Sequence, residues 1–243
     1  MHPLSAQQML AVWERGLGQI PLERALALLE AACPEHDRSA LAAMSIGQRD
    51  AWLLQLREWA FGSQITVCTV CRNCGQPLEL SFRVDDLCKG SNEGGPEQVS
   101  LSLGGFELLL RPINSLDIAS CLNSGTEETA RTLFRRCLIA ASAGGSTVAG
   151  DKVPDQVAQE AMDGLAKADA QADVEIHVSC EACHVTIREN FDIVSFFWSE
   201  IDTWARRMLH EIHILASAYG WKEADVLSLS RLRRQFYLEM VGA

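Results

Sequence analysis

The sequence predicts an α+β protein in which helical segments flank β-hairpins that carry paired cysteines. Apolar residues recur every three or four positions near both ends of the chain. Between these ends, β-rich runs alternate with tight polar turns. Two of the turns contain a Cys-x-x-Cys pair, in "CRNC" and "CEAC". We therefore expect a helical N-terminal region, zinc-linked hairpins that resemble zinc-ribbon knuckles, and a helical C-terminal arm.

Size and charge limit the functions that are open to the chain. Its 243 residues suffice for one large domain or two modest ones. The formal charge of −11 argues against nucleic acid as a partner, because phosphate binding needs a dense basic surface. No apolar run is long enough to span a bilayer, and "MHPLSAQQML" lacks the features of a signal peptide. We expect a protein of the cytoplasm that binds no membrane.

Residues 1–62 form the predicted N-terminal helical region. Residues 5–32 have the apolar spacing of two helices, broken at "GLGQIP", where Pro21 suits a helix start. A third helix covers "SIGQRDAWLLQLREWAFG", with Ser45 as its N-cap and Gly62 at its end.

Residues 63–112 change to the two-residue period of strands. "QITVCTVC" and "PLELSFRV" flank the turn "RNCGQ" and predict the hairpin of the first knuckle. "GSNEGGPEQ" is the best candidate for an internal linker, because it is polar and rich in glycine. "QVSLSLGGFELLLRPIN" predicts a second hairpin that turns at Gly104 and Gly105.

The middle of the chain, residues 113–172, is predicted to be helical. Asn114 or Ser115 can cap a short helix that runs to Leu122. "EETARTLFRRCLIAASA" then predicts a longer helix, and residues 154–170 predict another. Residues 173–192 return to strands, in "ADVEIHVSC" and "HVTIRENFDI", and predict the hairpin of the second knuckle.

Residues 193–243 form the predicted C-terminal helical arm. Two short helices follow Gly220, and Ser228 or Ser230 can cap the last. The long first helix carries one apolar stripe at spacings of three and four, which faces a core or a partner. Its members are Phe197, Ile201, Trp204, Met208, Ile212, Leu215 and Tyr219.

The cysteine pairs are the sharpest chemical signal. Nine cysteines in a chain without an export signal favour metal binding over disulfides. Cys71 and Cys74 lie at one hairpin tip, and Cys180 and Cys183 lie at another. Two such tips that meet would hold Zn²⁺ in a closed tetrahedral site, which ties distant parts of the chain together.

Cys68 leaves one ambiguity, because it forms a second Cys-x-x-Cys with Cys71. It lies inside the predicted strand, so we assign Cys74 to the site and leave Cys68 as a neighbour or spare ligand. A redox dithiol is the rival interpretation, but such pairs normally open a helix, whereas this tip leads into a strand. The four isolated cysteines are expected to be small buried apolar residues. They are Cys33, Cys88, Cys121 and Cys137.

Two further motifs do not support catalysis. "LHEIH" places His210 and His213 three residues apart, one short of the zinc-protease helix, so we expect a solvated helix face with Glu211 near Arg207. "GGSTVAGDK" lacks the Lys-Ser/Thr ending of a phosphate-binding loop and is expected to be a surface loop.

The arm also combines arginines with aromatic residues. The arginines, among them Arg231, can form a solvated face. Because they lie beside aromatic residues, they can equally form a docking surface, since arginine and aromatic residues are enriched at binding hot spots. The candidate partner-binding residues are Phe196, Phe197, Trp198, Trp204, Arg206, Arg207, Tyr219, Trp221, Arg233 and Arg234.

Several of these segments carry a family resemblance. "FFWSEIDTWARRMLHEIHILASAYGW", "FELLLRPINSLDIA" and the helix before "CRNCG" resemble the T-even-type phage baseplate protein family, which occurs in contractile phage tails and related injection systems. The family's cysteine pairs match Cys71, Cys74, Cys180 and Cys183, and Cys68 is extra to that pattern.

The resemblance implies a non-enzymatic assembly factor or minor component of a baseplate or hub. Its partners would be other baseplate, hub or spike proteins, with no small-molecule substrate, and it could enter the assembled tail particle. A zinc-ribbon module for nucleic-acid binding or regulation is the alternative, but Arg72 is the only cation between Gln64 and Arg83. A metalloenzyme would need an open zinc position, and four thiolates leave none.

Overall fold

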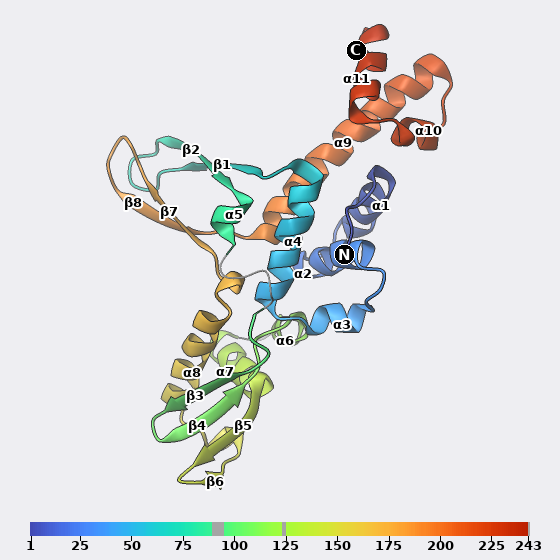
Figure 1. Cartoon of the computed structure of the whole chain (residues 1–243). Helices are drawn as coiled ribbons and strands as arrows, with labels where there is room; N and C mark the ends of the chain where they lie inside the picture. The colour runs from blue at the N-terminus through green and yellow to red at the C-terminus, as the bar shows by residue number, and fades with distance from the viewer. Residues whose placement is uncertain (89–94, 123–124, 243) are drawn as a thin grey trace. The chain divides into compact units, whose positions relative to one another are not determined.

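A computed structural model describes residues 1–88, 95–122 and 125–242 of the chain (Figure 1). It confirms the α+β class, with helices and three small antiparallel sheets. The chain divides into two compact units, Met1–Pro34 with Val194–Ala243, and Glu35–Ile193. In the described part of the chain, no helix combines the length and the apolar character that crossing a membrane requires.

The first unit brings the first two helices together with the C-terminal arm. Ser5 caps the first helix in a capping box with Gln8, and Pro21 opens the second, as predicted. The Trp13 indole donates a hydrogen bond of 2.8 Å to Asp202, which ties the first helix to the long helix of the arm. The unit contains α1 (Ala6–Gly16), α2 (Pro21–Ala32), α9 (Ile193–Tyr219), whose first residue lies at the unit boundary, α10 (Glu223–Ser228) and α11 (Arg231–Met240).

The apolar stripe of α9 is largely buried, as its spacing predicts. Trp204 is half-buried, and Tyr219, at the C-terminal end of the helix, is 38% exposed. The remaining members of the stripe are buried, namely Phe197, Ile201, Met208, Ile212 and Leu215.

The second unit contains the three sheets. Its first hairpin pairs β1 (Gln64–Val70) with β2 (Pro77–Arg83), and its last pairs β7 (Glu175–Ser179) with β8 (Thr186–Asn190), as predicted. The unit's other elements are α3 (Arg38–Ala43), α4 (Ile46–Phe61), α5 (Val84–Leu87), β3 (Val99–Leu103), β4 (Phe106–Leu110), α6 (Ser115–Cys121), α7 (Thr126–Cys137), β5 (Leu138–Ala143), β6 (Ser146–Thr147), a 3-10 turn (Gly150–Lys152), α8 (Asp155–Ala168) and a second 3-10 turn (Ala170–Ala172).

The predicted helix over residues 127–143 is wrong in its second half. The helix ends at Cys137, and Leu138–Ala143 forms β5, which pairs with β4 on one side and β6 on the other. Without β5, β4 would leave a row of backbone donors and acceptors unpaired, so tertiary pairing overrides the helical preference of the segment. The predicted second hairpin is thus half of a four-stranded sheet, in the order β3-β4-β5-β6.

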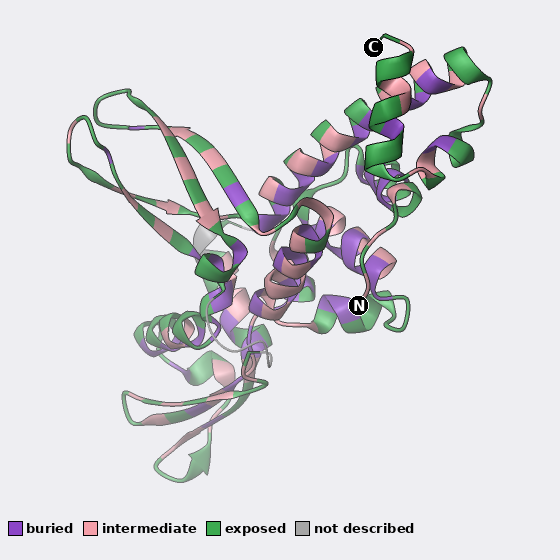
Figure 2. Cartoon of the chain, turned by 45° about the horizontal axis from the view of Figure 1, so that its top comes forward, coloured by how far each residue is buried: buried purple, intermediate pink, exposed green. Residues whose placement is uncertain are grey.

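The core of this sheet lies against α7 and α8. Leu108 and Leu110 of β4 and Phe134 of α7 are buried in it. Leu165 of α8 closes the same cluster. Figure 2 marks buried residues (purple) beside exposed ones (green) along the helices and strands.

Three smaller points complete the comparison with the predicted elements. The helix α3, which Asp37 caps, was not predicted. The expected surface loop over residues 144–152 contains β6 and a 3-10 turn. The predicted linker over residues 90–98 lies partly outside the described residues.

Asp117 is a buried carboxylate at the junction of α6 with the sheet. Its side chain is 0% exposed and accepts hydrogen bonds from Arg111 at 2.6 and 2.9 Å and from Arg136 at 2.8 Å. It also accepts from the backbone amide of Asn114, the N-cap of α6, at 3.0 Å. Burial by itself raises the pKa of this carboxyl, but the hydrogen bonds from Arg111 and Arg136 outweigh it and hold the pKa below its usual range.

We expect Asp117→Asn to lower the free energy of unfolding at pH 7 by about 2–3 kcal/mol, because it removes a buried carboxylate that accepts charge-assisted hydrogen bonds from two partly exposed arginines. Because the folded carboxyl has the lower pKa, its stabilisation is complete above an unfolded pKa of about 3.9 and is lost as pH falls through the folded value. Denaturant titrations at pH 7 and below pH 4 measure both effects.

The matched control is Asp155→Asn, since Asp155 is 75% exposed and pairs with Arg131 at 3.2 Å. It should cost no more than about 1 kcal/mol. Equal losses in the two variants at pH 7 would contradict a special role for Asp117.

Candidate metal centre

Two turns of the same backbone design hold the four predicted cysteine ligands. In the first, the Cys71 amide donates to Gln76 O at 2.8 Å, and the Gly75 amide donates to Cys71 O at 2.8 Å. In the second, the Cys180 amide donates to Val185 O at 3.0 Å and the amide four residues on donates to Cys180 O at 2.8 Å. Each turn therefore directs both of its cysteines to one side of its hairpin, so that the pairs can face each other.

The two turns differ at one position that the sequence analysis missed. Gly75 has a φ of +74°, and the equivalent residue of the second turn, His184, has a φ of +57°. Glycine adopts this left-handed conformation freely, whereas a residue with a Cβ atom pays about 1–2 kcal/mol for it. Aligning "CEACH" with "CRNCG" places His184 at the position of Gly75. The sequence alone could therefore have predicted a left-handed conformation at His184.

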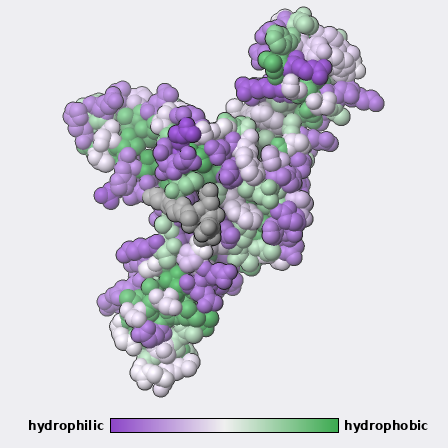
Figure 3. Space-filling model, in the orientation of Figure 1, coloured by the Kyte–Doolittle hydropathy of each residue, from purple (hydrophilic) through white to green (hydrophobic). Residues whose placement is uncertain are grey.

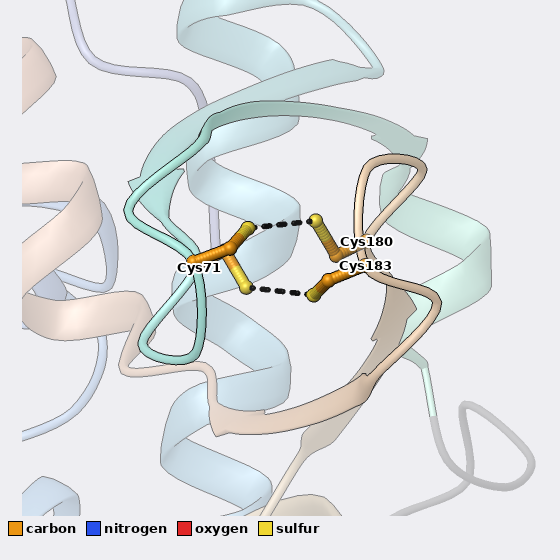
Figure 4. Close-up of side chains that lie close together, drawn as sticks. Cys71, Cys180 and Cys183 are labelled. Atoms are coloured by element: carbon orange, nitrogen blue, oxygen red, sulfur yellow. Dashed lines mark hydrogen bonds between the residues drawn. The ribbon is translucent and has the colours of Figure 1, made fainter.

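The structure brings the four cysteines together across more than a hundred residues of sequence. Cys71 Sγ lies 3.7 Å from Cys183 Sγ, and Cys74 Sγ lies 3.7 Å from Cys180 Sγ. All four sulfur atoms lie within 4.8 Å of one another. Figure 4 shows the two turns meeting, with Cys71 directed toward Cys180 and Cys183.

These distances fit a tetrahedral metal site. Four sulfurs at about 2.3 Å from a central zinc form a tetrahedron with edges of about 3.8 Å. Cys71 and Cys180 are buried, Cys183 is half-buried and Cys74 is exposed, so the site has one face near solvent. The four cysteines could therefore hold a metal ion, and an all-thiolate set suits a soft or borderline metal.

The electrostatics of the cluster favour a bound cation. Hydrogen bonds to Cys183 from the Asn73 side chain and the Val185 amide lower the pKa of that thiol to about 6. For Cys74, the Gln76 amide favours the thiolate, but desolvation and hydrogen bonds with the other three thiols outweigh it and raise the pKa to about 12. The first thiolate to form opposes the ionisation of its neighbours, so four thiolates need a cation among them.

The hairpins that carry the cysteines have little core of their own. Their side chains alternate between exposed and half-buried positions, and Ile65 is the only fully buried residue in these four strands. Away from the sulfurs, an ion pair of 2.8 Å joins Arg72 to Glu189, and an edge-to-face contact joins Phe82 to Phe191. Isolated two-stranded hairpins are marginally stable in water, so contacts between the two hairpins must supply much of their stability.

Cys68 lies outside the cluster. It is exposed in the middle of β1, opposite Glu79 of β2. Successive strand residues point to opposite faces, so Cys68 points away from the face that carries Val67 and Thr69. Period-two alternation could have shown this from sequence.

The other four cysteines differ in how far they are buried. Cys33 and Cys137 are buried, as expected for small apolar residues. Cys121 is only half-buried, and the prediction is wrong for Cys88, which is exposed just after the single helical turn of α5.

The His-Glu-Ile-His segment of α9 has the environment expected of a solvated face. His210 and His213 are exposed. Glu211 pairs with Arg207 at 3.6 Å and with Arg234 at 2.6 Å. Its carboxylate therefore forms ion pairs with two arginines of the first unit.

The structure separates the candidate partner-binding residues by exposure. Phe197, Trp198 and Arg234 are buried. Trp198 packs against Gly16 and lies under the Arg24 guanidinium, 4.6 Å from its ring centre. Phe196, Trp204 and Trp221 are half-buried, and the exposed candidates are Arg206, Arg207, Tyr219 and Arg233.

Comparison with known proteins supports one family. No curated protein and no solved structure matches the chain significantly. The model of the family described as T4 bacteriophage base plate protein matches residues 19–198, which include all four clustered cysteines. The match stops at Trp198, so it leaves out most of the C-terminal arm, although part of the family resemblance lies in that arm. Because it covers about three quarters of the sequence, the chain belongs to the T4 bacteriophage base plate protein family.

Proposed function

We propose that this chain is a non-enzymatic assembly factor or minor structural component of the baseplate or hub of a contractile phage tail or tail-like injection system. Family membership is the observation that carries the proposal. The chain would act by contacts with other baseplate, hub or spike proteins. It would work in the cytoplasm of the producing bacterium, where tails assemble, and as a component it would remain in the particle.

We further propose that Cys71, Cys74, Cys180 and Cys183 bind a structural Zn²⁺. The sulfur spacing of 3.7 Å and the sparse core of the hairpins support this role. Four thiolates complete the coordination of zinc and leave no position for substrate or water, which favours a structural metal over a catalytic one.

The same geometry weighs against the nucleic-acid alternative. Arg72, the cation of the first knuckle, pairs with Glu189 and so presents less positive charge to a phosphate. The chain's net charge of −11 also disfavours binding to the phosphates of a nucleic acid.

We expect about one zinc per chain in purified protein, and Cys180→Ser should lose the zinc together with much of the stability of the second unit. Zinc binding and folding are coupled in closed thiolate sites, where binding contributes on the order of 10 kcal/mol. Elemental analysis by mass spectrometry and thermal unfolding, with and without a chelator, measure both quantities.

Cys68→Ser is the matched control, since Cys68 is exposed and outside the cluster. It should keep both zinc and stability. Folded protein that lacks zinc, or that carries iron in its place, would contradict the proposed metal.

We expect the protein to be present in purified tails if it is a component, and to be bound to baseplate intermediates but absent from finished tails if it is an assembly factor. Quantitative mass spectrometry of the two fractions separates these cases. Its absence from both, in cells that produce tails, would contradict the proposed function.

A further inference from the structure

The cysteine cluster places each sulfur of one turn close to a sulfur of the other turn. The Sγ atoms of Cys74 and Cys180 lie 3.7 Å apart, and those of Cys71 and Cys183 also lie 3.7 Å apart. Because the sulfur–sulfur bond of a disulfide is about 2.0 Å long, each pair must approach by about 1.7 Å to form one. Both pairs join one hairpin to the other.

Solvent reaches the cluster through two of its four cysteines. Cys74 is exposed and Cys183 is half-buried, whereas Cys71 and Cys180 are buried. Each close pair therefore combines an accessible cysteine with a buried one. Figure 3 shows hydrophilic residues (purple) around the left-hand ends of the hairpins, where the turns lie. A small water-soluble oxidant can thus reach one sulfur of each pair, and the buried partner is held beside it.

We propose that these cysteines have a second, oxidised state, in which Cys74–Cys180 and Cys71–Cys183 disulfides join the two hairpins once the metal is lost. This rests on the proposed metal site and adds its response to oxidants of the peroxide class. A tail that leaves the producing cell passes from reducing to oxidising surroundings, which is where the second state would form.

The accessible cysteine of each pair reacts first. The sulfur of Cys74 attacks one oxygen of hydrogen peroxide, the O–O bond breaks and hydroxide leaves, which gives a sulfenic acid. The Cys180 thiolate then attacks this sulfur, so that the S–S bond forms, the S–O bond breaks and the oxygen leaves as water after it takes a proton. Each disulfide therefore takes two electrons from a pair of sulfurs and reduces one peroxide to two waters. Cys183 and Cys71 repeat these steps with a second peroxide.

Disulfides within each turn are the competing outcome, because all four sulfurs lie within 4.8 Å of one another. The 3.7 Å approaches between the turns favour bonds between them. Chain entropy favours them too, since a bond between positions 106 or 112 apart removes far more freedom from the unfolded chain than one that spans three positions. Only bonds between the turns can keep the hairpins together without a metal.

The test maps disulfides in full-length wild-type protein after treatment with a chelator and hydrogen peroxide, so it needs no variant that could fail to fold. Cleavage after Arg72 and Glu181 separates the two cysteines of each turn, so trypsin followed by a glutamate-specific protease distinguishes the possible pairings by mass spectrometry. We expect four of the nine free thiols to be lost, with Cys74 bonded to Cys180 and Cys71 bonded to Cys183.

Cys68→Ser is the matched control and should form the same two bonds, since Cys68 is exposed outside the cluster. The oxidised protein should keep its melting temperature when a chelator is added, whereas the reduced protein should lose stability, and dithiothreitol should abolish the difference.

Three outcomes would overturn the inference: disulfides within each turn, a disulfide to Cys68, or oxidation of Cys74 to a sulfinic acid while Cys180 keeps its thiol. None of them changes the zinc content of the untreated protein or the result of the particle analysis above. The proposed metal and the proposed function would therefore stand if this inference failed.

Discussion

The meeting of four cysteine thiols is the constraint that joins the first and last hairpins of the second unit. Cys74 and Cys180 are 106 positions apart, yet their sulfurs lie 3.7 Å from each other. Everything between them, including the four-stranded sheet with α7 and α8, belongs to a loop that this contact closes. Closing so long a chain segment costs conformational entropy, and a bound metal would offset that cost in a way that the small apolar surface of two hairpins cannot.

The knuckles and the sheet solve their stability problems by different means. The sheet buries a continuous apolar cluster that includes Leu108, Phe134 and Leu165, so packing alone can hold it. The hairpins bury only Ile65 among their strand residues. This contrast explains why the chain's clustered cysteines lie at the hairpin tips and nowhere in the sheet.

The two sides of α11 lie in different environments in the first unit. The inner side of α11 is fixed by Arg234 and Tyr237, and its outer side carries Leu232 and Phe236 into solvent. The buried arginine does not merely add stability, because its two hydrogen bonds determine which side of the helix faces outward.

Local chemistry made much of this protein predictable. The caps Ser5, Ser45, Asn114 and Ser230 mark helix starts because a hydroxyl or amide side chain accepts from a free amide of the first turn. The two Cys-x-x-Cys turns and their flanking strands are equally local, so their four cysteines were identified without any structure. Strand alternation also contained the answer for Cys68, since it points away from the half-buried face of β1.

What the sequence by itself determined was most of the helices, the two cysteine hairpins and the identity of the four clustered cysteines, because caps, turns and hairpins depend on neighbouring residues. Only the tertiary structure decided that Leu138–Ala143 is a strand, because its conformation depends on pairing with β4 and β6. Tertiary structure likewise decided which arginine of "RLRR" is buried, since Glu211 lies 23 residues away in sequence. The physical reason is the same in both cases: a partner distant in sequence supplies the interaction that selects one of several locally acceptable states.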